Sequence, residues 1–165
     1  MGVIPLRIGL LSDTHQDMKN SRLAVTCMGS VDLLLHAGDH YSDALVLAKE
    51  LNLEVKAVTG NCDFADEILE QVFELKGKKF LLTHGHLYGV KTGYQRLYYR
   101  AKELKVDVVV FGHTHIPENR VVDDILLVNP GSISRPRVTR EGTFGIMEYK
   151  GREWAVHIKK LSRKE

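Results

Sequence analysis

The chain has 165 residues, of which 44% are hydrophobic and 27% charged, which suffices for one soluble domain with a substantial core. Its net charge of +2 is too small to indicate nucleic acid as a partner. No apolar stretch approaches the roughly 20 residues that a membrane helix needs, so we expect no membrane partner.

Short runs rich in Val, Ile and Leu alternate with amphipathic stretches at the start of the chain. Strands separated by helical segments of roughly 10–15 residues indicate β-α-β crossovers and parallel pairing. The elements expected here are strand 6–11, helix 17–29, strand 31–36, helix 41–51 and strand 53–58.

The rest of the chain changes character. A hairpin signal, Lys76-Gly77-Lys78, separates strands at 73–75 and 79–82. The later expected elements are helix 92–104 and strands 107–111, 119–123, 125–128, 143–149 and 152–161. Alternating units followed by a strand-rich half predict an α/β fold, a four-layer αββα sandwich of two mixed β-sheets with helices outside.

Side chains that can bind metals follow several of these apolar runs, at the carboxyl ends where open sheets collect ligands. Two carboxylates, one amide and four imidazoles are expected at one rim, which fits two metal ions that share a bridging carboxylate. Because these residues span much of the chain, we expect a single domain, residues 1–165. The candidate ligands are Asp13, His15, Asp39, Asn61, His84, His113 and His115.

Each motif alone has a structural explanation. Asp13 would serve as a helix N-cap, Asp39 as the capping residue of a β-α turn, and Asn61 as part of an Asx turn. In an extended chain, residues two apart project to one side, so Asp13 and His15 would grip one ion. Two His-x-His pairs, at 84–86 and 113–115, in register with the Asp motifs are hard to explain by packing and favour the metal interpretation.

The chain resembles the calcineurin-like metallophosphoesterase superfamily over nearly its full length, and within it the small bacterial and archaeal phosphodiesterase branch. The resemblance lies in motifs that follow the family's order. They are Asp13-Thr14-His15, Gly38-Asp39, Gly60-Asn61-Cys62-Asp63, Thr83-His84-Gly85-His86, Gly112-His113-Thr114-His115 and Asn129-Pro130-Gly131-Ser132.

The resemblance implies a metallo-dependent phosphatase-like fold and two divalent ions, with manganese first and nickel, iron or zinc as alternatives. One ion would be held by Asp13, His15 and His115, the other by Asn61, His84 and His113, with Asp39 as the bridge. The implied activity is hydrolysis of a small phosphodiester through a metal-bridging hydroxide.

One position departs from the family pattern. Many members have a histidine directly after the ligand asparagine, which is thought to protonate the leaving group, whereas this chain has Cys62. A thiol is a poor substitute, so proton donation must be weak or come from elsewhere. Cys62 could also be a packed thiol without a chemical role. The other candidate proton donors are His86, Asp63, His40 and His36.

Residues outside the metal motifs give weaker signals. Arg135 and Arg137 could contact phosphate as bidentate donors or could be solvated. Lys91 and the tyrosines of 92–104 could shape a substrate wall, although packing or self-association explains those tyrosines better, so a homodimer stays open.

Two other function classes stand beside the enzyme: a non-catalytic protein-interaction scaffold of the same fold, like the retromer scaffold subunit, and a metal or nucleotide sensor without turnover. Loss of a histidine ligand would favour the scaffold, whereas all seven candidate ligands are present. With Cys27 and Cys62 the only cysteines and no signal-peptide pattern, we expect a cytoplasmic protein.

Overall fold

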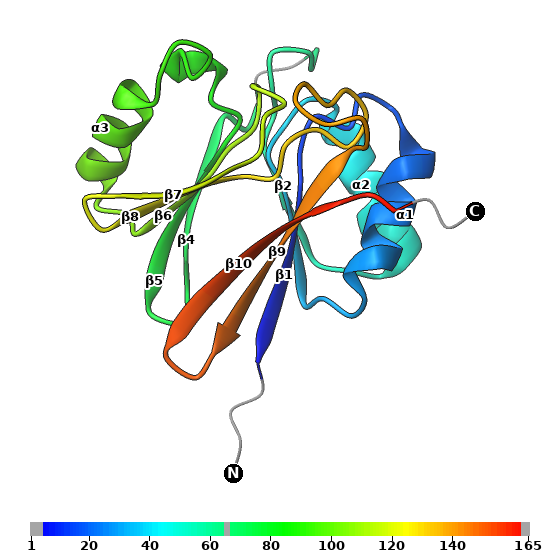
Figure 1. Ribbon diagram of the computed structural model, residues 1–165, viewed down its shortest axis with the longest axis horizontal. Helices are drawn as coiled ribbons and strands as arrows, with labels where there is room; N and C mark the ends of the chain where they lie inside the picture. Colours follow the sequence, from blue (N-terminus) through cyan, green and yellow to red (C-terminus); the bar gives the residue numbers. More distant parts are fainter. Residues whose placement is uncertain (1–4, 65–66, 163–165) are drawn as a thin grey trace.

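The computed structural model describes residues 5–64 and 67–162, so the start of the chain, examined above for a signal peptide, lies partly outside it. Within these ranges the strands form two five-stranded mixed sheets, with helices on the outside (Figure 1). The predicted αββα sandwich is confirmed.

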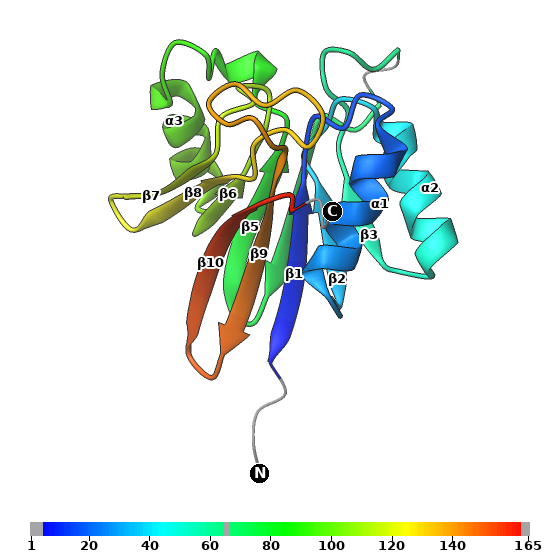
Figure 2. The same cartoon turned by 45° about the vertical axis from the view of Figure 1, so that its right-hand side comes forward.

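The first sheet has the order β10-β9-β1-β2-β3, in which β1, β2 and β3 are parallel and β9 and β10 antiparallel. Helices α1 and α2 provide the crossovers and cover its outer face (Figure 2). The elements are β1 (Leu6–Leu11), α1 (Met18–Met28), β2 (Leu33–His36), α2 (Tyr41–Leu51), β3 (Val55–Ala57), β9 (Thr143–Lys150) and β10 (Glu153–Lys160).

The second sheet has the order β4-β5-β6-β8-β7, with β5, β6 and β8 parallel. Helix α3 covers its outer face, and the short 3-10 helix η1 lies between β5 and α3. The elements are β4 (Glu70–Leu75), β5 (Lys78–Thr83), η1 (His86–Tyr88), α3 (Gln95–Leu104), β6 (Val108–Val110), β7 (Glu118–Val122) and β8 (Ile125–Asn129).

Alternating side chains of single strands separate the layers. In β2, Leu33 and Leu35 enter the core between the two sheets, whereas Leu34 packs under α1 and α2. In β5, Phe80 faces the inner core and Leu81 packs under α3. Because successive side chains of a strand point to opposite faces and both faces are buried here, the central residues of these strands are all apolar.

The predicted elements agree with the structure except at some boundaries. Strand β4 begins at Glu70, before the expected 73–75, because Glu70 and Gln71 pair with Thr83 and Leu82. Because Glu70 and Gln71 are polar, the hydrophobic pattern did not predict that the strand includes them. The helix expected at 92–104 begins only at Gln95, and η1 was not expected. Among the described residues, no helix is long and apolar enough to cross a membrane.

Candidate metal centre

The loop after β1 presents Asp13 and His15 in the left-handed backbone region, with φ of 53° and 44°. The extended conformation expected for this pair is therefore wrong. The amide of Asp13 donates to the carbonyl of Gly38 at 3.0 Å, and the hydroxyls of Ser132 and Ser134 donate to the Asp13 carbonyl at 2.8 and 2.9 Å. These bonds hold the loop in a shape that the local sequence alone does not favour.

Asp39 follows β2 through Gly38 and buries its carboxylate, with 2% of the residue exposed. Gly38 has φ of 95°, and a Cβ there would lie 2.7 Å from the His84 Nδ1 atom. The close backbone approach predicted at Gly38 is therefore required by the histidine that passes over it.

A first cluster joins loops from both sheets. Its ligand atoms, from Asp13, His15, Asp39 and His115, all lie within 4.8 Å of one another. The His115 Nε2 atom is 3.1 Å from Asp13 Oδ1 and 3.5 Å from His15 Nε2, and His15 Nε2 is 3.6 Å from Asp39 Oδ2. Four potential ligands thus face one point.

A second cluster lies on the other side of Asp39, with ligand atoms of Asp39, His84 and His113 within 4.8 Å. The His84 Nε2 atom is 3.3 Å from Asp39 Oδ1, 3.2 Å from His113 Nδ1 and 3.0 Å from Asn61 Oδ1. The structure thus brings all seven predicted ligands together, three from the second sheet and four from the first.

Backbone carbonyls orient two of the imidazoles. The Nδ1 atoms of His84 and His115 lie 2.7 and 2.8 Å from the carbonyl oxygens of Ala37 and Arg135. Because a carbonyl only accepts, each Nδ1 must carry a proton, and in a neutral ring Nε2 then presents its lone pair to the cluster. This is the common arrangement of a histidine that binds a metal.

The buried oxygens also fit a cation. Asp13 is fully buried; its Oδ2 accepts from the Ser12 hydroxyl at 2.5 Å and from the His113 amide at 3.1 Å. Its Oδ1 accepts no hydrogen bond from the described residues. A buried carboxylate oxygen without a donor is unfavourable, and the ring nitrogens around it make a mixed oxygen and nitrogen site typical of divalent ions.

Residues 6–152 match the family model of the calcineurin-like phosphoesterase superfamily domain. The chain belongs to the calcineurin-like phosphoesterase superfamily. It is 38% identical over 144 residues to the probable metallophosphoesterase YsnB of Bacillus subtilis, covering 86% of this chain and 83% of that protein. It is 32% identical to a phosphodiesterase of Methanocaldococcus jannaschii, covering 90% and 96% of the two chains.

Solved structures agree with this phosphoesterase assignment. A predicted phosphoesterase from Streptococcus pneumoniae TIGR4 superposes with a TM-score of 0.81 at 30% identity, over 96% of this chain and 91% of that one. Vacuolar Protein Sorting 29 from Cryptosporidium parvum has a TM-score of 0.74 at 17% identity, over 98% and 100% of the chains, which shows the shared fold alone. The phosphodiesterase among the relatives supports the predicted enzyme class.

The ionisation states in this phosphoesterase favour metal ligation. Burial, with the charges of His84 and Lys91, lowers the pKa of His113 to about 4, and burial also lowers the pKa of His15. Burial opposes ionisation of Asp39, but the hydrogen bond and charge of His84, together with the hydrogen bonds from Cys62, outweigh it and hold the pKa of Asp39 below the usual range. Neutral imidazoles and an ionised carboxylate are the metal-binding forms.

The pKa of His84 is shifted upward, in the opposite direction to the pKa values of His113 and His15. Burial lowers the pKa of His84, but the hydrogen bond with Asp39, the charges of Asp13 and Asp39 and the hydrogen bond with the Ala37 carbonyl together outweigh it and raise the pKa. Without a cation, the raised pKa favours the protonated form of His84, whereas Asp39 stays ionised. Metal binding must displace that proton, which makes metal affinity dependent on pH.

The candidate proton donors separate into two groups. Asp63 accepts from the amides of Gly60 and Tyr41 at 2.8 Å, and His36 is fully buried, so both serve the loop structure. His40 and His86 lie beside the clusters: their rings are 5.3 Å from that of His15 and 5.4 Å from that of His84.

Cys62 is exposed and lies at the second cluster. Its amide donates to Asp39 Oδ1 at 3.0 Å. Burial and the negative charge of Asp39 raise the pKa of the thiol, so Cys62 is a neutral thiol at pH 7. The predicted weakness of proton donation at this position is consistent with that state.

The two arginines occupy different places. The Arg135 carbonyl accepts from His115, and the Arg135 charge contributes, after burial, to the low pKa of His15, so this arginine lies by the first cluster. Arg137 instead lines a pocket beside Thr114. Ser132 and Ser134 were not predicted as site residues, although the Asn129-Pro130-Gly131-Ser132 motif marked the segment.

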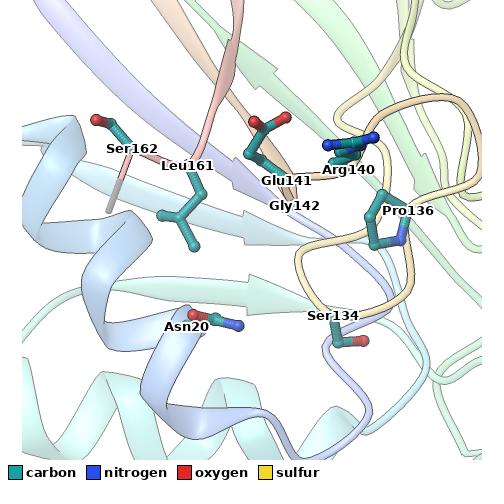
Figure 3. A pocket seen from close by; sticks show the side chains of 8 residues that line it. All are labelled: Asn20, Ser134, Pro136, Arg140, Glu141, Gly142, Leu161 and Ser162. Carbon is teal, nitrogen blue, oxygen red and sulfur yellow. The ribbon is translucent and has the colours of Figure 1, made fainter. Parts of the chain in front are cut away.

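A larger cavity of about 470 Å³ lies against the segment that follows this motif (Figure 3). Asn20 of α1 forms one wall, and Leu161 projects between the loop and the helix. No candidate ligand lines this cavity, and the opposite charges of Arg140 and Glu141 favour no ligand of one sign. The cavity therefore does not belong to the metal centre.

Proposed function

We propose that this phosphoesterase binds two divalent ions and hydrolyses small phosphodiesters. One observation carries the proposal: the two oxygens of Asp39 face different clusters, Oδ2 toward His15 at 3.6 Å and Oδ1 toward His84 at 3.3 Å. A carboxylate divided in this way suits a bridge between two cations better than a ligand to one. Asp13, His15 and His115 would hold one ion, and Asn61, His84 and His113 the other.

Two such ions, when bound, would lower the pKa of a shared water and so would supply a metal-bridging hydroxide as the nucleophile near neutral pH. The protein's part is to keep Asp39 ionised, to orient the imidazoles through Ala37 and Arg135, and to offer the Arg135 guanidinium to a phosphoryl oxygen. Manganese is the metal we favour, with nickel, iron or zinc as alternatives. We further propose that the protein is cytoplasmic and forms a homodimer.

The centre has a weak proton donor for the oxygen of the leaving group. The neutral Cys62 thiol is a poor donor near pH 7, and His86 is the histidine beside the second cluster. We propose that leaving groups which need little protonation react much faster than alkoxides.

The test uses protein stripped with chelator, reloaded with manganese and assayed with bis(p-nitrophenyl) phosphate. We expect activity to rise until two equivalents are bound, and Asp39→Asn to abolish that dependence. Lys49→Ala, at an exposed position of α2, is the control and should behave as wild type. Saturation at one equivalent would contradict a binuclear centre.

The scaffold alternative predicts a different result. A protein-interaction module of this fold would bind metal without turning over any ester. Two bound ions and no hydrolysis of a panel of phosphodiesters would favour that function. The complete ligand set and the catalytic relatives favour the enzyme.

A further inference from the structure

An open pocket of about 310 Å³ lies directly beside the metal centre and has no role in the activity described so far. Thr114, which lines it, stands between the candidate ligands His113 and His115. A substrate whose phosphorus lies at the clusters would extend one of its ester groups toward this pocket. The lining residues are Val90, Lys91, Tyr94, Thr114, Ile116 and Arg137.

The walls of the pocket are mostly apolar and held in place. Tyr94 packs edge-to-face on Phe111, with ring centroids 5.2 Å apart, and its hydroxyl bonds Glu118 at 3.2 Å. Val90 is buried, and Ile116 is 39% exposed. An aromatic face with aliphatic neighbours suits a ring-sized apolar group, and a volume near 300 Å³ lies at the lower end of small-molecule sites.

The hydroxyl of Thr114, a residue that lines the pocket, already has hydrogen-bond partners within the protein. The Thr114 hydroxyl donates to the Ile116 carbonyl and accepts from the side-chain amide of Asn129, at 3.3 and 3.0 Å. With its hydroxyl engaged in these bonds, Thr114 adds little polar capacity to the pocket, which agrees with its mostly apolar lining.

Two cations stand at the pocket, and within the described residues neither has a carboxylate within 4.0 Å. They are Lys91 and Arg137. The nearby Glu118 carboxylate is matched by Arg120 at 3.4 Å and by the Tyr94 hydroxyl. Two cations that line a mostly apolar pocket without a carboxylate partner favour an anionic ligand group.

Both cations also neighbour the metal centre. The Arg137 amide donates to the carbonyl of His115 at 3.4 Å. The positive charge of Lys91 helps to lower the pKa of His113, although burial and the charge of His84 contribute more. The pocket and the clusters therefore lie within reach of one small molecule.

We propose that this pocket accepts one ester arm of the substrate, and that this arm combines a ring-sized apolar group with a second anionic group. The inference rests on the proposed phosphodiesterase function and names its substrate class. The ring would pack on Tyr94 and Ile116, while Lys91 and Arg137 would bind the second anion.

Three substrates that all release p-nitrophenolate test this proposal, because the leaving group is then constant. They are methyl p-nitrophenyl phosphate, thymidine 5′-(p-nitrophenyl phosphate), and the same nucleotide ester with a 3′-phosphate. With manganese-loaded protein we expect kcat/KM to rise roughly 10- to 100-fold from the first to the third, in line with charge-assisted hydrogen bonds. Equal values for all three would overturn the proposal.

Single substitutions test the anion-binding part and the apolar part of the pocket separately. Lys91→Ala and Arg137→Ala should lower the ratio of kcat/KM for the 3′-phosphorylated ester over the unphosphorylated one. Ile116→Asn should instead lower the ratio of the thymidine ester over the methyl ester. Lys49→Ala should leave both ratios at wild-type values. Unchanged ratios in Lys91→Ala and Arg137→Ala would overturn the anion part of the proposal.

A binding measurement keeps this inference separate from the proposed function. Calorimetry with thymidine 3′,5′-bisphosphate should show binding that Lys91→Ala weakens and Lys49→Ala preserves. If no ester is hydrolysed but this pattern is seen, the proposed function fails and the pocket assignment stands. If esters are hydrolysed without preference and the bisphosphate binds both variants equally, the function stands and the pocket assignment fails.

Discussion

At the scale of single residues, most of the candidate ligands hold unusual backbone conformations. Asp13, His15, Asp39, His113 and His115 all have positive φ, between 44° and 71°. Such conformations are uncommon outside glycine and cluster at functional sites, where neighbouring contacts hold them. Here the hydrogen bonds from Ser132 and Ser134 to the Asp13 carbonyl provide one such restraint.

Asp39→Asn should lose more metal than Asn61→Ala. Asp39 faces both clusters with separate oxygens, whereas the side-chain oxygen of the exposed Asn61 lies beside His84, in the second cluster. We expect less than one ion per chain in Asp39→Asn and between one and two in Asn61→Ala, by elemental analysis after dialysis. Two retained ions in Asp39→Asn would refute the shared role.

The rate should depend steeply on the pKa of the leaving group. Cys62 is neutral at pH 7 but a weaker acid than a free thiol, and general acids commonly contribute about 10²–10⁴-fold. A series of aryl methyl phosphates would give the slope. A flat slope, with chemistry shown to be rate-limiting, would mean that another group donates the proton.

Cys62→His should raise turnover of an alkyl phosphodiester. An imidazolium, with an ordinary pKa near 6.5, donates a proton near neutral pH better than this thiol does. Turnover and metal content should be measured on the same preparation, because the larger ring could displace Asn61. Full metal occupancy without any gain would contradict a missing acid, and Cys27→His, on α1, serves as the matched control.

At the scale of elements, a buried network ties β2 to the loop after β1 and to α2. The Gly38 amide donates to His36 Nδ1 at 3.2 Å, so His36 Nε2 donates to the Thr14 hydroxyl at 3.0 Å. That hydroxyl donates to Asp43 at 2.6 Å, and the Gln16 amide donates to the same carboxylate oxygen at 2.9 Å. The loop carrying Asp13 and His15 is therefore positioned by β2 and α2.

The network makes stability depend on pH. Burial lowers the pKa of His36 from 6.5 to about 4, and the carboxylates of Asp43 and Asp13 only partly oppose it. Below pH 6.5 the unfolded chain binds a proton that the folded protein excludes, so stability falls as the pH drops toward 4. The expected slope is about 1.4 kcal/mol per pH unit, a loss of roughly 3 kcal/mol across the window.

Urea unfolding of the chelator-treated protein between pH 4 and 7 measures this effect. His36→Gln removes the titrating group while it keeps an N–H donor for Thr14. The difference in unfolding free energy between wild type and variant should therefore change across that range. A difference independent of pH would show that His36 titrates normally in the folded protein.

At the scale of the whole molecule, the centre depends on the packing of the two sheets. Asp13, His15, Asp39 and Asn61 follow strands of one sheet, and the remaining three ligands follow strands of the other. Phe80 of β5 is fully buried between the sheets and contacts Trp154 of β10 edge-to-face, with centroids 5.4 Å apart. It also stacks on Phe73 of β4.

Phe80→Ala should destabilise the protein by about 3–5 kcal/mol, because it leaves a cavity where the sheets meet. Val121→Ala, at a side chain that is 66% exposed on β7, should change stability by less than about 0.5 kcal/mol. Urea denaturation compares the two variants. A loss below about 1 kcal/mol in Phe80→Ala would show that the sheets do not depend on this ring.

The sequence by itself determined the order of the elements and the layers of this protein, and it marked the seven polar side chains that gather at one rim. Leu33, Leu34 and Leu35 predict a strand buried on both faces, and Asp39, shortly after the strand, predicts a polar side chain at the rim. These predictions succeed because side-chain period and strand polarity are local properties that the chain carries residue by residue.

Only the tertiary structure decided the conformation of Asp13 and His15, the division of the Asp39 oxygens and the place of Arg137 at a separate pocket. Each depends on contacts between residues far apart in the chain, such as Ser132 with Asp13 and Gly38 with His84. Local sequence patterns do not predict such contacts, because the contacts form only when the two sheets pack and bring their loops to one rim.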